Sequence, residues 1–314
     1  MIPSLPVGET AALGAAIIWS VTSIVFANAG RAGSPVAVNA FKTLAGAILF
    51  AAAILIRDGS GAASGIAGRD ALLLALSGFI GLSIGDSLLF RAFVMLGTRR
   101  AMLLFSLNPL LGAVGGFLFL REALGPLALA GMAVALAGVS LVIGDRRKAA
   151  PDGLTAGTAN GRGEPVGAPN VLGLGILYAF GAALGQASGA LIIKSSLSRV
   201  DTLTATAIRM AAGACGLLLI GGATGRLARW TVLLARGGRL MRLAAASVLG
   251  PFIGVYLMVL SLDRAPTGVA LTLLSTTPIW LLPLGAWLQK DRPSKREVVG
   301  AFVALAGVAL LVFR

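Results

Sequence analysis

The chain has 314 residues, of which 57% are hydrophobic and 12% are charged, and its mean hydropathy is +0.92. This composition excludes a soluble globular domain and indicates a membrane protein built almost entirely of helices. The formal net charge of +14 does not indicate a nucleic-acid partner, because the Lys and Arg residues lie mainly in short joins between apolar runs.

A lipid core of about 30 Å requires about 20 apolar residues per helix. Apolar runs between charged or Gly- and Pro-rich joins predict ten transmembrane helices. We expect them near residues 10–29, 36–56, 71–95, 101–120, 126–144, 171–194, 202–222, 243–262, 267–288 and 297–313. The sequence thus predicts an all-α, multi-pass membrane protein.

One long polar stretch divides the ten predicted helices into two groups of five. Residues 149–170 are rich in Gly, Pro and Ala and are expected to form a flexible linker loop. We therefore predict a first five-helix unit over residues 1–148 and a second over residues 171–314.

The two predicted units are copies of one another. Residues 81–141 align without a gap to residues 250–310, and the run Val134–Val139 is identical to Val303–Val308. Because five is odd, two such units in series must enter the membrane in opposite senses. The duplication is therefore expected to be an inverted repeat, a pattern typical of transporters with a site between the copies.

The orientation of the chain stays open. The joins after predicted helices 1, 3, 5, 7 and 9 hold about sixteen Lys and Arg residues, and those on the opposite side hold about seven. The positive-inside rule places the richer side in the cytoplasm, and hence both termini outside.

Three charged residues lie inside predicted spans, where each is costly and needs a reason. They are Lys42, Asp86 and Arg209, and the two cations occupy equivalent positions of the repeat. Asn39 shares a helix face with Lys42. Either the cations line a substrate site or their side chains extend to the headgroups.

Depth along the helices places Lys42 and Asp86 close together, at roughly 9 and 13 Å below the same surface. We expect them to pair directly or through water. Asp86 is the candidate proton carrier, because it is the acid well inside a predicted span. A static ion pair is the alternative.

Polar side chains precede two prolines at equivalent positions, Pro109 and Pro278. Asn108 and Thr276 are the candidate binding residues there, because a proline that interrupts a helix frees a carbonyl group. A simple packing kink is the alternative. Three further side chains are candidates for the substrate site: Trp19, Gln186 (which aligns with Trp19) and Tyr256.

The order of several short motifs resembles the EamA family of the drug/metabolite transporter superfamily over essentially the whole chain. The motifs are Trp19-Ser20, the cation of helix 2 and its repeat, Ser106–Pro109 before Arg121-Glu122, and Ser275–Pro278 before Lys290-Asp291. Val255 replaces the acid in the second copy. The resemblance implies a ten-helix transporter of the inner membrane with cytoplasmic termini, which conflicts with the charge count.

We therefore expect a secondary active transporter that exports an amino acid or organic acid by alternating access. Coupling of this transport to protons through Asp86 is a further hypothesis. A passive facilitator or channel, or a carrier of sugar-nucleotide or lipid-linked substrates, is the alternative. An enzyme is disfavoured, because the chain has no His and one cysteine, Cys215. We expect no cofactor, no metal and no nucleic acid; the expected partners are a small-molecule substrate and the bilayer, with the chain a monomer or homodimer.

Overall fold

The structure is a computed structural model, and in the part of the chain that it describes the regular secondary structure is entirely helical. That part comprises residues 6–31, 34–59, 66–96, 101, 104–105, 107–143, 169–228, 230, 239–277, 279–280, 283 and 294–312. The linker predicted at 149–170 lies outside it, apart from the first two residues of a helix.

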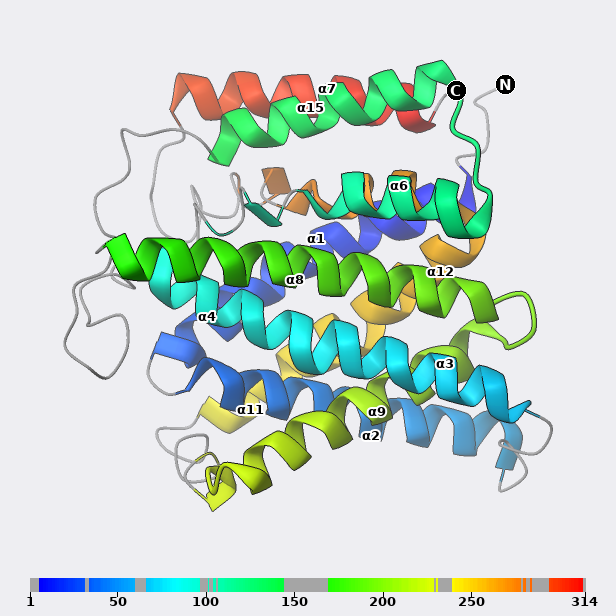
Figure 1. The fold of residues 1–314 in the computed structure, drawn as a ribbon, viewed down its shortest axis with the longest axis vertical. Coiled ribbons are helices and arrows are strands. Elements are labelled where there is room, and N and C mark those ends of the chain that lie inside the picture. Colours follow the sequence, from blue (N-terminus) through cyan, green and yellow to red (C-terminus); the bar gives the residue numbers. More distant parts are fainter. Residues whose placement is uncertain are drawn as a thin grey trace.

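The first repeat consists of elongated helices that run side by side (Figure 1). Its elements are α1 (Val7–Arg31), α2 (Pro35–Asp58), α3 (Gly68–Gly78), the π-helix η2 (Phe79–Gly85), α4 (Asp86–Leu96), α6 (Asn108–Leu120) and α7 (Pro126–Ile143).

The second repeat follows the same order. Its elements are α8 (Pro169–Ser196), α9 (Thr202–Ala223), α11 (Arg239–Ser247), the π-helix η5 (Val248–Gly254), α12 (Val255–Arg264), α13 (Thr267–Leu274) and α15 (Lys295–Val312).

Among the described residues, five helices are long and apolar enough to cross a membrane: Pro35–Asp58, Gly68–Ala92, Gly173–Ser196, Thr202–Ala223 and Leu240–Arg264. Shorter apolar helices cover Asn108–Leu120, Pro126–Leu141 and Val298–Leu310. The chain is therefore a multi-pass helical membrane protein, and the number ten remains a prediction.

The two repeats run in opposite directions. In Figure 1, α2 passes from left to right and its counterpart α9 from right to left. Counterpart contacts also match: a Cβ on Gly14 would lie 3.3 Å from Leu257, and one on Gly181 would lie 3.2 Å from Leu88. The repeat is therefore inverted, with a pseudo-two-fold axis between its copies.

The two π-helices are counterparts as well, since η2 and η5 begin and end at equivalent positions of the repeat. A π-helix holds an extra residue in the turn and is frequent at functional sites. The helices predicted over 71–95 and 243–262 are each continuous, and each contains one of these π-helical segments. In η5 a proline, Pro251, lies inside it.

Local sequence signals explain the helix ends. Ser34 begins α2 by accepting a hydrogen bond from the backbone nitrogen of Ala37, and a proline follows it at the first helical position. Asp201 begins α9 in the same way, at the equivalent position of the second repeat.

One prediction about the prolines needs correction. Pro109 lies in the first turn of α6, where a proline costs little because its missing N–H has no partner in a helix. It therefore begins a helix instead of interrupting one, and the predicted helix over 101–120 is divided by a turn at Leu107. Pro278 lies outside the described residues.

The helices α7 and α15 lie against each other across the two-fold axis. A Cβ on Gly138 would lie 2.2 Å from the backbone nitrogen of Ala304, and one on Gly307 would lie 2.3 Å from that of Ala135. Small residues therefore allow the two backbones to touch.

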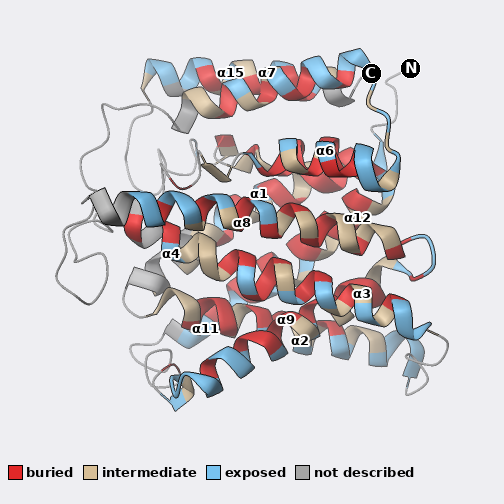
Figure 2. Ribbon diagram, viewed as in Figure 1, coloured by how far each residue is buried: buried red, intermediate tan, exposed pale blue. Residues whose placement is uncertain are grey.

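Buried residues occupy the facing sides of the helices, and exposed residues lie on the outside of the bundle (Figure 2). Many of the exposed side chains are large and apolar. Outward-facing side chains include Ile56, which is 86% exposed, and Phe119, which is 78% exposed. Such a surface suits contact with lipid chains.

Candidate functional site

The centre of the candidate site is the ion pair between Lys42 and Asp86. The Nζ atom of Lys42 lies 2.9 Å from Oδ2 of Asp86, and both side chains are largely buried. Lys42 lies on α2, and Asp86 is the first residue of α4, directly after the π-helix η2. The pairing expected from their depths, either direct or through water, is thus confirmed, and it is direct.

The second oxygen of the same carboxylate is held by the other repeat. Gln186, on α8, donates from its Nε2 atom to Oδ1 of Asp86. Asp86 is thus held by a cation from its own repeat and by an amide from the other repeat. The carboxylate therefore joins the two halves of the molecule inside the membrane region.

The aromatic ring of Phe90 completes the surroundings of Lys42. The ring centroid lies 5.4 Å from Nζ, a distance at which a cation is attracted to the face of a ring. Phe90 was not among the predicted site residues. Its spacing of four residues from Asp86 places both on one helix face, and that spacing could have revealed it.

Asn39 positions the helix next to this pair. It is fully buried, and its Nδ2 atom donates to the carbonyl oxygen of Leu82 at 3.1 Å. Leu82 belongs to the π-helix, so Asn39 fixes α2 against the segment that precedes Asp86. This contact gives Asn39 a structural role, although it shares the helix face of Lys42.

Arg209, the repeat counterpart of Lys42, has a different environment. Its side chain is fully buried, and Nη1 donates to the carbonyl oxygen of Gly189 at 3.0 Å and to the hydroxyl of Ser77. The hydroxyl of Ser77 in turn donates to the same carbonyl at 2.6 Å. The alternative that Arg209 extends to the headgroups is therefore wrong.

Close packing surrounds the Arg209 guanidinium. Its Nε and Nη2 atoms are buried without a hydrogen-bond partner. A Cβ on Gly81 would lie 2.8 Å from Nη2, which leaves no room for another group on that side. Arg209 therefore fastens α9 to α3 and α8 and does not offer a free cation to a solute in this conformation.

Comparison with known proteins assigns the family. The model of the EamA-like transporter family matches residues 6–144 and 173–313, one match for each repeat. The chain belongs to the EamA-like transporter family.

The fold of this EamA-like chain is also found among solved structures. One crystal structure, titled only "Crystal structure of protein", has a TM-score of 0.74 and 19% sequence identity over 98% of this chain and 96% of that chain. At this identity the likeness shows the fold alone. No curated protein matches the sequence significantly.

Two of the predicted site residues of the EamA-like chain, Trp19 and Tyr256, pack against its hydrophobic core. The indole of Trp19 lies against Gly254, where an added Cβ would come within 2.7 Å of Nε1. Trp19 and Gln186 thus occupy equivalent positions of the two repeats. Trp19 packs against the backbone of Gly254, whereas Gln186 binds the carboxylate of Asp86.

The two polar residues before the prolines make different contacts. The hydroxyl of Thr276 donates to the carbonyl oxygen of Leu273 at 2.6 Å and accepts from Nε1 of Trp280 at 3.3 Å. The Oδ1 atom of Asn108 is buried without a partner. Of the nine predicted site residues, the described contacts bring only Lys42, Asp86 and Gln186 together directly.

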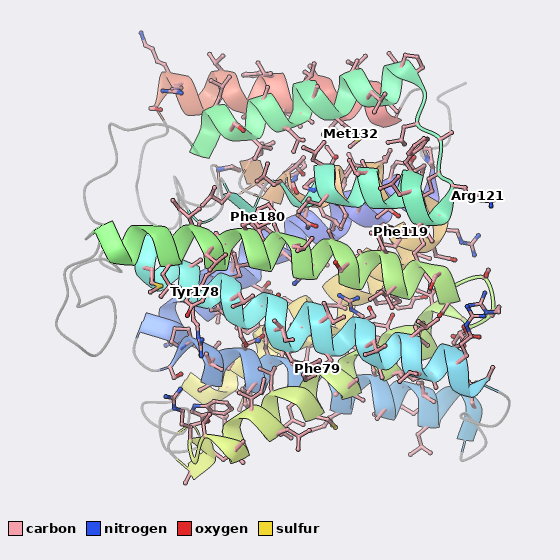
Figure 3. The ribbon with its side chains drawn as sticks, in the orientation of Figure 1. Phe79, Phe119, Arg121, Met132, Tyr178 and Phe180 are labelled. Atoms are coloured by element: carbon pink, nitrogen blue, oxygen red, sulfur yellow. The ribbon has the colours of Figure 1, made fainter. Side chains whose placement is uncertain are left out.

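Arg91, five residues after Asp86 on α4, makes a separate contact with the other repeat. Its guanidinium lies 5.8 Å from the centroid of the Tyr178 ring, on α8 of the other repeat. Figure 3 labels Tyr178 near the end of the bundle where α8 begins.

A set of charged contacts near the other end of the bundle was not predicted from the sequence. They comprise Arg57 with Asp201, Asp70 with Arg199, and Glu122 with Lys194. Within the described residues, no group of three or more His, Cys, Asp or Glu could hold a metal ion.

Two of these groups lie in the joins outside the spans, and their pKa values respond to the contacts. Partial burial opposes the charge of Asp201, but hydrogen bonds from Arg57 and Thr204 outweigh it and lower the pKa of Asp201 to about 2. The hydrogen bonds to Asp70 raise the pKa of the Arg199 guanidinium. Both groups are therefore charged at neutral pH.

Proposed function

We propose that this EamA-like protein is a secondary active transporter that exports a small organic metabolite by alternating access. Family membership supports a membrane transporter of the drug/metabolite type. The observation that carries the finer proposal is the Asp86 carboxylate, which Lys42 and Gln186 hold from opposite repeats.

A carboxylate in this position can couple proton binding to a change of conformation. Protonation removes the charge that holds Lys42, and it weakens the hydrogen bond from Gln186. The two repeats are then less strongly joined at this point. Proton binding at Asp86 would thus favour the rearrangement that exposes the site to the other side of the membrane.

The proposed substrate carries a carboxylate, as an amino acid or organic acid does. When Asp86 is protonated, Lys42 lacks its partner and can pair with an anionic group on the solute. Proton and solute then cross together, and the outward gradient of the metabolite drives both. Lys42, rather than Arg209, is the cation proposed to meet the solute, because Arg209 is held by Ser77 and Gly189.

The proposed topology has ten helices with both ends on one side. In Figure 1, α1 begins and α15 ends on the same side of the bundle, as an even number of crossings requires. The family resemblance supports the cell inner membrane and cytoplasmic ends. We propose that each chain forms one transport path, whether it is a monomer or one half of a homodimer.

Counterflow in proteoliposomes tests this function. A thermal-shift screen with amino acids and carboxylic acids first selects a stabilising compound, whose radiolabelled form is then used. We expect internal unlabelled compound to accelerate uptake of the labelled compound, as a carrier requires. Uptake that does not respond to internal compound would instead support the passive facilitator.

A carrier for sugar-nucleotide or lipid-linked substrates is less well supported. Such a substrate needs basic groups free to meet phosphate. Within the described spans, Lys42 and Arg209 are held by protein groups, and one acid lies directly beside Lys42. Including a nucleotide sugar in the thermal-shift screen tests this alternative.

A further inference from the structure

Three ion pairs join the two repeats at one end of the bundle. In each, one partner precedes residue 148 and the other follows residue 171: Arg57 with Asp201, Asp70 with Arg199, and Glu122 with Lys194. We call this set the end pairs. The helices that carry them end or begin on the side of Figure 1 where α1 begins and α15 ends.

The pair between Asp70 and Arg199 is bidentate. Nη2 and Nε of Arg199 lie 2.6 and 2.9 Å from Oδ1 and Oδ2 of Asp70, and the carboxylate side chain is only 6% exposed. Nη2 also donates to the carbonyl oxygen of Ser195 at 2.9 Å. The guanidinium therefore fixes the start of α3 against the end of α8 in a single geometry.

Glu122 joins three segments. Its Oε1 lies 2.6 Å from Nζ of Lys194, and its Oε2 accepts from the backbone nitrogen of Thr267 at 2.7 Å. Thr267 is the first residue of α13, so a carboxylate of the first repeat satisfies the start of a helix in the second. Lys194 also donates to the carbonyl oxygen of Ala265. Figure 3 labels the neighbouring Arg121 at this edge of the molecule.

Arg57 makes the third and most exposed contact. Its Nη1 lies 2.7 Å from Oδ1 of Asp201, the residue that begins α9, and its Nη2 lies 3.1 Å from the hydroxyl of Thr204. More than a third of each charged side chain is exposed, so water screens this pair most.

The end pairs cannot be formed at the equivalent positions of the opposite end. The counterparts of Arg57 and Asp201 are Thr224 and Ser34. Those of Asp70 and Arg199 are Arg239 and Ala32, and those of Glu122 and Lys194 are Asp291 and Ala27. None of these combinations brings opposite charges together. The symmetry of the repeat is therefore broken in the sequence at these six positions.

This asymmetry has a consequence for a transporter with inverted repeats. Its second conformation arises when the two repeats exchange their conformations, which closes the end that was open and opens the other. The end pairs have no oppositely charged equivalents at the counterpart positions of the other end, and they therefore favour the conformation in which their own end is closed.

We propose that the end pairs form a gate that holds the side of the chain ends closed. The gate biases the protein toward the conformation that gives access from the opposite side. This inference rests on the proposed alternating access, and it assigns the opening of that side to the breaking of Asp70–Arg199 and Glu122–Lys194. Arg57–Asp201 contributes least because it is the most exposed.

Distances between spin labels test the gate in the full-length protein reconstituted in lipid nanodiscs. With Cys215 replaced by serine, one label pair is placed at Ala67 and Ser198, two exposed residues beside the gate. A second label pair at Ala29 and Thr224 reports the opposite end. The test variant combines Asp70→Asn, Arg199→Gln, Glu122→Gln and Lys194→Gln, which keep hydrogen-bonding groups but remove the charges.

We expect the test variant to gain a population with a longer distance at Ala67–Ser198 and a shorter one at Ala29–Thr224. The ratio of open to closed populations at the gate should rise on the order of tenfold or more. The control is Asp263→Asn with Arg264→Gln, because that pair lies at the same end but within one repeat, at 2.9 Å. The control should keep the wild-type distances.

A charge exchange provides a second, independent variant. Asp70→Arg with Arg199→Asp should restore the closed population relative to either single change, since the pair is re-formed in reverse. The gate is contradicted if the folded test variant keeps wild-type distances at both ends, or if the control shifts equally. If the test variant shows the expected distance shifts but the wild type shows no counterflow, the result would count against the proposed transport and not against the gate.

Discussion

Nζ of Lys42 lies 2.9 Å from Oδ2 of Asp86, at the point where a π-helix gives way to α4. The other oxygen of that carboxylate accepts from Gln186 of the opposite repeat. A single acid thus connects a cation of one half with an amide of the other. An acid that can also bind a proton is a suitable element for coupling proton movement to the relative motion of the two halves.

The Lys42–Asp86 pair should show strong coupling in a double-mutant cycle. Lys42→Gln or Asp86→Asn alone leaves a largely buried charge without its partner, and each should cost about 1–3 kcal/mol of stability. The double variant should cost less than the sum of the two single changes. Unfolding by heat in detergent measures the four proteins. Strictly additive losses would show that the pair contributes no interaction.

We expect Gln186 to affect stability and transport through its hydrogen bond to Asp86 rather than through packing. Gln186→Leu keeps most of the side-chain volume but removes the donor to Oδ1, and we expect a loss of about 1–2 kcal/mol and slower transport. Ser188→Ala lies on another face of α8 and serves as the control. Stability and counterflow are measured for both. Equal behaviour of the two variants would show that the hydrogen bond has no role.

The contact of α3 with α9 leaves no room for a methyl group at Gly78. A Cβ there would lie 2.0 Å from the carbonyl oxygen of Arg209, so the backbones would have to separate. Gly78→Ala should cost about 1–3 kcal/mol of stability. Gly173→Ala is the matched control, because nothing lies within 4 Å of its Cβ position and alanine favours a helix. A Gly78→Ala protein as stable as the control would contradict this packing.

Asp201 should contribute stability that depends on pH in acid. Its pKa is lowered to about 2 in the folded chain, because the hydrogen bonds from Arg57 and Thr204 outweigh partial burial. Because the pKa is lower in the folded chain than the value of about 3.9 in the unfolded chain, Asp201 stabilises the folded state at pH values above about 3.9. This stabilisation is lost as the pH falls toward the folded pKa of about 2. The difference in melting temperature between wild type and Asp201→Asn should therefore be present at pH 6 and shrink below pH 4. A difference that stays constant down to pH 2.5 would contradict it.

Much of this architecture could be predicted from the sequence, because the duplicated motifs determine the order of the helices. The Lys42–Asp86 pair followed from depth along two helices, since a rise of 1.5 Å per residue converts position into depth. Gln186 emerged as the repeat counterpart of Trp19. These predictions needed only periodicity and an aligned repeat.

Other features depend on contacts between distant segments. The π-helices leave no clear signal in composition, and Pro251 inside η5 was the one residue that could have indicated them. The partners of Arg209 are a serine hydroxyl and a glycine carbonyl, which no pattern distinguishes from other small residues in a span. The end pairs could not be matched either, because their partners lie on different helices whose ends meet only in the folded chain.

The central claim is that Asp86 carries a proton during transport. Proteoliposomes loaded with a pH-sensitive dye and with the compound found by thermal shift provide the measurement. We predict that efflux of the compound raises the internal pH for the wild type, because a proton leaves with each molecule, while Asp86→Asn shows counterflow without any proton movement. Proton movement that persists in Asp86→Asn at the wild-type ratio to the compound would contradict the claim.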